Sequence, residues 1–272
     1  MTIVVTGGGG NVGGELVRLL AAAGEKVVAV SRGPARLPDG VRHSPADLGE
    51  PASLKAAFDG ADALFLLVAG QEPRAVLEAA EAGGIRRVVL LSSQGAGTRP
   101  GLYAHPVAFE EAVRASGLEW TILRPGGFHS NALAWAGTVR ADRTAAAPFA
   151  DVALPGIDPA DIAEVAAATL REDGHAGRTY ELTGPEPASP RQRAAAIGAA
   201  LGAEVRFTEQ TREEARADML RFMPEPAVEG ALAILGTPSA AELRVSPDVE
   251  RVLGRAPRTF ADWAARNVAM FR

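Results

Sequence analysis

The chain has 272 residues, of which 47% are hydrophobic and 22% charged, and its formal net charge is −5. These values are typical of a globular protein and exclude collagen-like and intrinsically disordered classes. The mild acidity argues against a nucleic-acid-binding surface. The sequence contains no cysteine, which excludes disulfide scaffolds, cysteine-ligated metal or iron–sulfur centres and thiolate nucleophiles.

The sequence carries no signal for a membrane. Its longest apolar run, at 63–69, is far shorter than the roughly 20 residues that a membrane-spanning helix needs. The N-terminus begins with a strand pattern instead of a basic segment followed by an apolar stretch. We therefore predict a protein without a signal peptide or membrane contact, located in the cytoplasm.

The first 125 residues alternate between short apolar runs and longer amphipathic segments. The predicted strands are Thr2–Thr6, Lys26–Ser31, Val41–Ser44, Asp62–Val68, Arg86–Ser92 and Glu119–Arg124. The predicted helices are Asn11–Ala23, Pro51–Asp59, Glu72–Ala82 and Tyr103–Ser116. Nearly continuous apolar strands indicate burial on both faces of a parallel sheet. Strand–helix alternation of this kind predicts a Rossmann-type, doubly wound α/β fold.

The pattern changes after Pro125-Gly126-Gly127, where the chain is interrupted. Further helices are predicted at Ala132–Gly137, Asp158–Leu170, Pro190–Leu201, Glu213–Phe222 and Thr259–Phe271, and strands at Thr179–Thr183 and Glu204–Thr208. We predict a dinucleotide-binding domain over 1–130, with 151–172 packing back on it. Residues 131–150 and 173–272 are then expected to form a smaller mixed α/β lobe for a substrate or partner.

The strongest motif is Thr-Gly-Gly-Gly-Gly-Asn-Val-Gly-Gly at 6–14, between the first strand and the first helix. Both G-x-G-x-x-G and T-G-x-x-G-x-x-G fit this segment. In such motifs one glycine permits a tight turn, one admits a pyrophosphate and one lets the helix pack closely on the strand. The helix N-terminus adds N–H donors for the phosphates. The predicted dinucleotide contacts here are Gly7, Gly10, Asn11, Val12 and Gly13.

The end of the second strand indicates which dinucleotide is preferred. A carboxylate at this point would favour NAD, but the sequence has Ser31 and Arg32, with Arg36 close behind. A guanidinium can pair with a 2′-phosphate and stack on adenine, which favours NADP(H) and leaves NAD(H) possible. Asp47 and Leu48 follow the third strand and could contact the adenine, although Asp47 could equally cap the next helix.

In a doubly wound fold, ligands lie at the carboxyl ends of the strands. That rule predicts further cofactor contacts at Val68, Ala69, Gly70, Ser92, Ser93, Pro125, Gly127 and Phe128. It also suggests substrate contacts at Gln94 and His129, over an apolar or aromatic small molecule. Trp135 lies in the C-terminal half, where it could line the same pocket or equally belong to the core of the smaller lobe. We predict no metal site, because the four histidines lack ligand spacing.

Several segments together resemble the NmrA-like, NAD(P)-binding branch of the atypical short-chain dehydrogenases/reductases. They are Thr6–Gly13, Ser31-Arg32, Asp47-Leu48, Val88–Ser93, the run Ser-Gly-Leu-Glu-Trp-Thr-Ile-Leu-Arg-Pro-Gly-Gly-Phe at 116–128 followed by Asn131, and the segments 158–163 and 180–184. The resemblance implies either a reductase for quinones, azo dyes or triphenylmethane dyes, or a non-catalytic redox sensor with a regulatory protein partner.

The wider superfamily uses a Tyr-x-x-x-Lys pair, in which the lysine lowers the tyrosine pKa. Tyr103 stands at the expected place, but Val107 follows four residues later and both lysines, Lys26 and Lys55, lie elsewhere. Ketone reduction with that pair is therefore disfavoured. Hydride transfer to an already electrophilic acceptor remains open, with Tyr103 or His105 as candidate catalytic groups.

The other polar residues near this point are expected to be incidental. Glu110 and Glu111 are expected on a solvated helix face, with the alternative that one of them pairs with an arginine or hydrogen-bonds a ligand. His43 and His175 are expected to be loop histidines. The preferred hypothesis is an NAD(P)H-dependent oxidoreductase for an apolar conjugated acceptor such as a quinone or azo compound, and its exposed helices could support a homodimer. The alternatives are the redox sensor, and a reductase or isomerase of a secondary-metabolite pathway.

Overall fold

The structure is a computed structural model that describes residues 1–34 and 36–272. The chain divides into two compact units. Unit 1 comprises Met1–Ser93, Ala104–Arg124 and Pro159–Glu181, and unit 2 comprises Gln94–Tyr103, Pro125–Asp158 and Leu182–Arg272. Each unit is described by itself. The functional division into a dinucleotide-binding domain and a substrate lobe stays a prediction.

Unit 1 is built on a seven-stranded sheet in the order β3-β2-β1-β4-β5-β6-β8. The strands are β1 (Thr2–Thr6), β2 (Lys26–Ser31), β3 (Arg42–Pro45), β4 (Ala63–Leu67), β5 (Arg87–Leu91), β6 (Glu119–Pro125) and β8 (Arg178–Leu182). The pairs from β3 to β6 are all parallel. The order 3-2-1-4-5-6 is that of a dinucleotide-binding Rossmann sheet, so the predicted fold class is confirmed.

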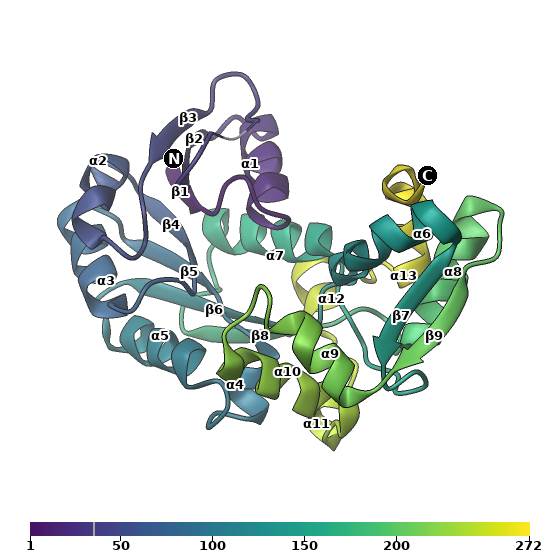
Figure 1. Cartoon of the computed structure of the whole chain (residues 1–272). Helices are drawn as coiled ribbons and strands as arrows, with labels where there is room; N and C mark the ends of the chain where they lie inside the picture. Colours follow the sequence, from purple (N-terminus) through teal and green to yellow (C-terminus); the bar gives the residue numbers. More distant parts are fainter. Residues whose placement is uncertain (35) are drawn as a thin grey trace. The chain divides into compact units, whose positions relative to one another are not determined.

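Helices cover both faces of this sheet (Figure 1). Helices α1 (Gly13–Ala22) and α7 (Pro159–Arg171) pack together on one face. The other face carries η1 (Pro51–Leu54), α2 (Lys55–Phe58), α3 (Pro73–Ala82) and α5 (Ala104–Ala115). The strands are buried on both sides, as their continuous apolar sequences predict.

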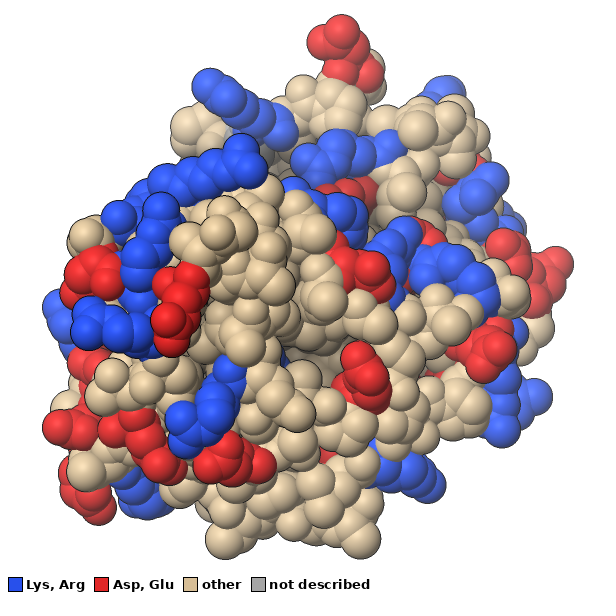
Figure 2. Space-filling view, turned by 90° about the vertical axis from the view of Figure 1, so that its right-hand side faces the viewer, with Lys and Arg blue, Asp and Glu red and all other residues tan. Residues whose placement is uncertain are grey.

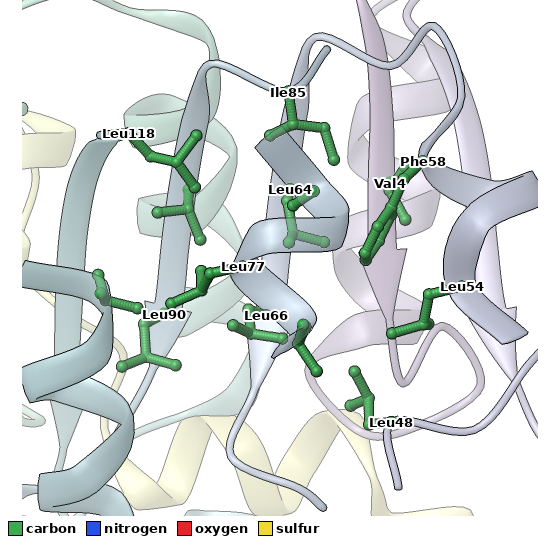
Figure 3. Packing of buried hydrophobic residues seen from close by; sticks show 14 of the residues in the cluster. Val4, Leu48, Leu54, Phe58, Leu64, Leu66, Leu77, Ile85, Leu90 and Leu118 are labelled. Atoms are coloured by element: carbon green, nitrogen blue, oxygen red, sulfur yellow. The ribbon is translucent and has the colours of Figure 1, made fainter. Parts of the chain in front are cut away.

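The core under α2, α3 and α5 is mainly aliphatic, with the rings of Phe58 and Phe109 fully buried in it. Phe58, Leu54 and Leu64 are fully buried, and Leu66, Leu77 and Leu90 extend the cluster along the sheet (Figure 3). Burying each such side chain contributes about 1.5–3 kcal/mol relative to leaving it exposed. This packing fixes β1, β4 and β5, whose carboxyl ends carry candidate site residues.

Unit 2 contains a parallel pair of strands, β7 (Thr144–Pro148) and β9 (Arg206–Gln210), with helices around it. The helices are α4 (Gln94–Thr98), η2 (His129–Trp135), α6 (Ala136–Asp142), α8 (Pro190–Leu201), α9 (Arg212–Met219), α10 (Glu225–Gly236), α11 (Ala240–Leu243), α12 (Asp248–Leu253), α13 (Phe260–Arg266) and η3 (Val268–Phe271). The sequence analysis missed β7, whose Thr-Ala-Ala-Ala-Pro lacks strand-favouring side chains, and α10, whose sequence contains Pro and Gly.

Basic and acidic side chains alternate over the face shown in Figure 2. Within unit 2, Arg212 and Arg216 both form ion pairs with Glu229. No helix in the described part of the chain, 1–34 and 36–272, is long and apolar enough to cross a membrane.

Candidate functional site

The glycine-rich turn joins β1 to α1 in a conformation that requires glycine. Gly7 has a left-handed backbone, with φ of +66°, and a Cβ there would lie 2.3 Å from Leu67 Cδ1. A Cβ on Gly8 would come within 2.8 Å of Ala29 Cβ, and one on Gly13 within 2.2 Å of the Gly7 carbonyl oxygen. Steric constraints therefore explain glycines of both motifs that fit the sequence, G-x-G-x-x-G and T-G-x-x-G-x-x-G.

The turn closes through its own backbone and continues directly into the first turn of the helix. The Gly10 N–H donates to the Gly7 oxygen at 2.8 Å, and the Gly14 N–H donates to the Gly10 oxygen at 2.8 Å. Val12 is buried and anchors the turn, whereas Asn11 is exposed. A backbone cradle without side chains, followed by a helix N-terminus, fits the pyrophosphate of a dinucleotide.

The end of β2 presents polar and basic groups. Ser31 is half-buried, and its hydroxyl donates to the Gly33 oxygen at 2.7 Å. Arg32 and Arg36 are both exposed. His43 lies on β3, which pairs with β2, and its Nε2 is 2.9 Å from Ser31 Oγ, so the expectation of a loop histidine is wrong.

The residues proposed for the adenine are placed differently from one another. The Asp47 carboxylate accepts from the Gly49 N–H at 2.9 Å, which stabilises the loop after β3. The Leu48 side chain belongs to the hydrophobic core in Figure 3. Gly70 follows β4 with φ of +79°, and a Cβ there would lie 2.4 Å from the Leu48 oxygen. The loops after β3 and β4 are thus in backbone contact, with Val68 and Ala69 half-buried beside them.

A buried carboxylate joins the ends of β5 and β6. Glu110, on α5, is 1% exposed and accepts a hydrogen bond from the Ser92 hydroxyl at 2.6 Å. Arg124, at the end of β6, donates to both carboxylate oxygens, at 2.9 and 2.6 Å. Arg114 donates to one of them at 2.9 Å. The expectation that Glu110 lies on a solvated face is wrong, and the alternative of a pair with an arginine is confirmed, while Glu111 is exposed as expected.

The charge state of Glu110 follows from these contacts. Burial by itself would raise the pKa of Glu110, but the hydrogen bonds from Arg124 and Ser92 outweigh burial and hold the pKa below its usual value. The carboxylate is therefore ionised at neutral pH. Ser93 is half-buried next to Ser92.

The two candidate catalytic groups have structural contacts. The Tyr103 ring lies against Gly95 and Gly230, where an added Cβ would approach ring atoms within 2.4 and 2.9 Å. Burial raises the pKa of Tyr103, and the nearby Glu242 carboxylate acts in the same direction. His105 is exposed, with its Nε2 2.6 Å from the Gly70 oxygen.

The segment after β6 belongs to unit 2 and forms a backbone ladder with 156–157. The Ile157 N–H donates to the Gly127 oxygen at 2.9 Å, and the His129 N–H donates to the Ile157 oxygen at 2.8 Å. Gly127 is exposed, Phe128 is half-buried and Pro125 is buried. This arrangement fixes the backbone at which the sequence analysis predicted cofactor contacts.

The residues predicted for the substrate are mostly packed inside unit 2. His129 is 4% exposed and meets Phe260 edge-on at 5.2 Å between ring centroids. Burial and the nearby Arg193 lower the pKa of His129 to about 4, so the ring is neutral at pH 7. Gln94 is buried at the start of α4. The Trp135 Nε1–H donates to the Ala146 oxygen at 2.8 Å.

The fold and the glycine-rich turn between β1 and α1 define the class of protein. It is a Rossmann-type protein with a dinucleotide-binding glycine turn and a basic group at the end of β2. The sequence profile of the NAD(P)H-binding family matches residues 7–173. The chain belongs to that family, and the predicted NAD(P)H cofactor is thereby confirmed. In residues 1–34 and 36–272 we find no cluster of His, Asp or Glu that could hold a metal ion.

Three similar proteins are named as reductases or oxidoreductases. The chain is 35% identical to the (4-alkanoyl-5-oxo-2,5-dihydrofuran-3-yl)methyl phosphate reductase of Streptomyces griseus, over 99% of both chains. It is 33% identical to the NAD(P)H azoreductase of Xenophilus azovorans, again over 99% of both. The NADPH complex of an NADPH-dependent quinone oxidoreductase from Escherichia coli aligns with a TM-score of 0.80 and 25% identity, covering 97% of this chain and 99% of that one.

Proposed function

We propose that this protein is an NAD(P)H-dependent reductase that transfers hydride to a small, apolar, conjugated acceptor such as a quinone or an azo compound. The observation that carries the proposal is the sterically required glycine turn, Gly7 to Gly13, in a chain that belongs to the NAD(P)H-binding family. The azoreductase and quinone oxidoreductase names of similar full-length proteins support the class of acceptor.

The finer assignment is to the NmrA-like branch. The run Ser-Gly-Leu-Glu-Trp-Thr-Ile-Leu-Arg-Pro at 116–125 supports it, and the structure gives that run a physical role. Arg124 ends β6 as the partner of buried Glu110, and Pro125 terminates the strand. The motif residues therefore hold the strand end from which the Gly127 and Phe128 backbone continues.

A reductase of this kind does not need the Tyr–Lys pair. Tyr103 keeps its proton because burial raises its pKa, and Val107 stands where the activating lysine would be. A bound NADPH would supply the hydride, and the chain would supply orientation of the two reactants. A quinone or azo acceptor is electrophilic already, so water can deliver the proton.

The cofactor preference proposed is NADP(H) over NAD(H). Its support is the exposed Arg32 guanidinium at the end of β2, with Arg36 after it in the same loop. A guanidinium can form two parallel hydrogen bonds to the 2′-phosphate of NADP(H). The 2′-hydroxyl of NAD(H) carries no charge and cannot form such a pair.

The test is turnover with both cofactors over a panel of quinones and azo dyes, followed through the loss of reduced-cofactor absorbance. We expect oxidation above background and a preference for NADPH that Arg32→Asp abolishes. Cofactor binding measured by titration serves as the control in each case. Tight NADPH binding with no oxidation by any acceptor would contradict the reductase and favour the redox sensor.

A further inference from the structure

A histidine that the cofactor motifs do not include lies at the edge of the proposed NADP(H) site. His43 is on β3, the edge strand of the sheet, next to β2. Its Nε2 lies 2.9 Å from Ser31 Oγ. Ser31 is the last residue of β2, the place at which many dinucleotide-binding folds carry an Asp or Glu that accepts a hydrogen bond from the ribose 2′-hydroxyl.

The direction of this hydrogen bond follows from the number of hydrogens. Ser31 has one hydroxyl hydrogen, and the Gly33 carbonyl oxygen, 2.7 Å away, can only accept it. Ser31 Oγ must therefore accept from His43, so the imidazole carries its hydrogen on Nε2. The result is a directed chain in which His43 donates to Ser31 and Ser31 donates away from His43.

We propose that His43 is a positioning residue for the 2′-phosphate of NADP(H), because it keeps the Ser31 hydroxyl oriented as a donor toward the ligand. This inference rests on the proposed NADP(H) preference and extends it. A phosphate oxygen accepts hydrogen bonds, as the Gly33 oxygen does, so the hydroxyl can turn from one to the other while His43 still donates to its oxygen. Ser31 then acts beside the Arg32 guanidinium.

A hydrogen-bond donor at the end of β2 explains how Ser31 and His43 would distinguish NADP(H) from NAD(H). An Asp or Glu at this position accepts hydrogen bonds and repels a phosphate, which selects NAD. A serine with a free hydroxyl could either donate or accept. A serine whose oxygen already accepts from an imidazole N–H keeps its own hydrogen available for an acceptor, which matches an oxygen that carries negative charge.

The test compares two nucleotides that differ only in the 2′-phosphate, adenosine 2′,5′-bisphosphate and 5′-AMP. Their dissociation constants are measured by calorimetry for the wild type and for His43→Leu, His43→Gln and Ser31→Ala. We expect the wild type to prefer the bisphosphate. His43→Leu and Ser31→Ala should each lower the ratio of affinities by about tenfold, the worth of one hydrogen bond to a charged group.

The remaining variants separate positioning from mere packing. His43→Gln keeps an N–H donor of similar reach and should retain most of the ratio, and the double variant of His43→Leu and Ser31→Ala should lose no more than either alone. The matched control is His175→Leu, because His175 is also half-buried and bonded to a hydroxyl, that of Tyr180 at 2.8 Å. It should leave the ratio unchanged.

Three results would overturn the inference. If His43→Leu weakened the binding of both nucleotides equally, His43 would have a structural role only. If Ser31→Ala left the ratio of the two affinities unchanged, the Ser31 hydroxyl would not contact the 2′-phosphate. A wild type without preference would remove the NADP(H) proposal as well. Because neither nucleotide can be reduced or oxidised, a protein that passes this test but reduces no acceptor would fail only the reductase proposal.

Discussion

At the scale of single residues, two neighbouring acids on α5 have opposite environments. Glu110 is 1% exposed and bonded to Ser92, Arg114 and Arg124, whereas Glu111 is exposed. Consecutive helical residues point about 100° apart, so one faces the sheet and the other the solvent. The buried carboxylate is costly to desolvate, and its three donors compensate for that cost.

Removing Glu110 should therefore destabilise the protein far more than removing Glu111. Glu110→Ala leaves two guanidinium groups without their buried partner, and we expect the free energy of unfolding to fall by about 3–5 kcal/mol. Glu111→Ala should change it by no more than about 0.5 kcal/mol. Urea denaturation followed by circular dichroism measures both. Similar losses in the two variants would contradict the role assigned to the buried carboxylate.

At the scale of elements, the short helices of unit 2 depend on their first turns. Helices α8, α9, α11 and α13 each begin with a capping box, in which the side chains of the N-cap and N3 residues bond each other's backbone N–H. In α11 the N3 residue is Glu242, which is fully buried and also binds Arg99 at 2.8 Å. A helix of four residues cannot be stable by propensity alone.

The Glu242 contact should make stability depend on acid pH. Burial opposes ionisation, but the bonds from Arg99 and the Ser239 N–H outweigh it and lower the pKa of Glu242 to about 2. A carboxyl with a lowered folded-state pKa contributes stability above its unfolded pKa and loses it as pH falls toward the folded value. We expect a loss on the order of 3 kcal/mol between roughly pH 5 and pH 2.

Glu242→Gln provides the comparison for this pH dependence. The amide does not titrate, so the stability difference between wild type and variant should be largest near neutral pH and shrink as the solution is acidified. Unfolding by urea at several pH values in that window measures the difference. A difference that stays constant from neutral to acid pH would show that Glu242 does not contribute through its charge.

At the scale of the whole molecule, cofactor binding and stability are linked. A ligand that binds only the folded protein stabilises it by about 2.7 kcal/mol at a concentration one hundred times its dissociation constant. A substitution in the glycine turn should abolish the stabilisation by the cofactor while leaving the hydrophobic core unchanged. A Cβ on Gly13 would lie 2.2 Å from the Gly7 oxygen, but one on Gly14 would lie 3.7 Å from its nearest neighbour, the Gly8 oxygen.

Thermal unfolding with and without NADPH tests the turn. We expect NADPH to raise the Tm of the wild type and of Gly14→Ala by several degrees, and to leave Gly13→Ala nearly unchanged. NADH at the same concentration should give a smaller rise in the wild type. An equal shift in Gly13→Ala would show that the turn tolerates a methyl group and that the cofactor does not depend on its close backbone contact.

Much of unit 1 was predictable because its signals are local. Continuous apolar strands such as Val27–Val30 predict a parallel sheet, and a glycine run at residue 7 predicts the turn at which a phosphate binds. Unit 2 was less predictable. The β7 strand has three alanines, and its pairing with β9 depends on a partner about sixty residues later in the chain. Tyr103 could be named from its position, but its contacts with Gly95 and Gly230 could not.

The sequence by itself determined the order of strands and helices in unit 1, the glycine turn and the basic end of β2, because these are encoded in near neighbours. Only the tertiary structure decided which polar groups meet. Ser31 and His43 are 12 residues apart, Glu110 and Arg124 are 14 apart, and Arg99 and Glu242 are 143 apart. Such pairs depend on which strands lie side by side and which helix face turns inward, and no local propensity specifies that arrangement.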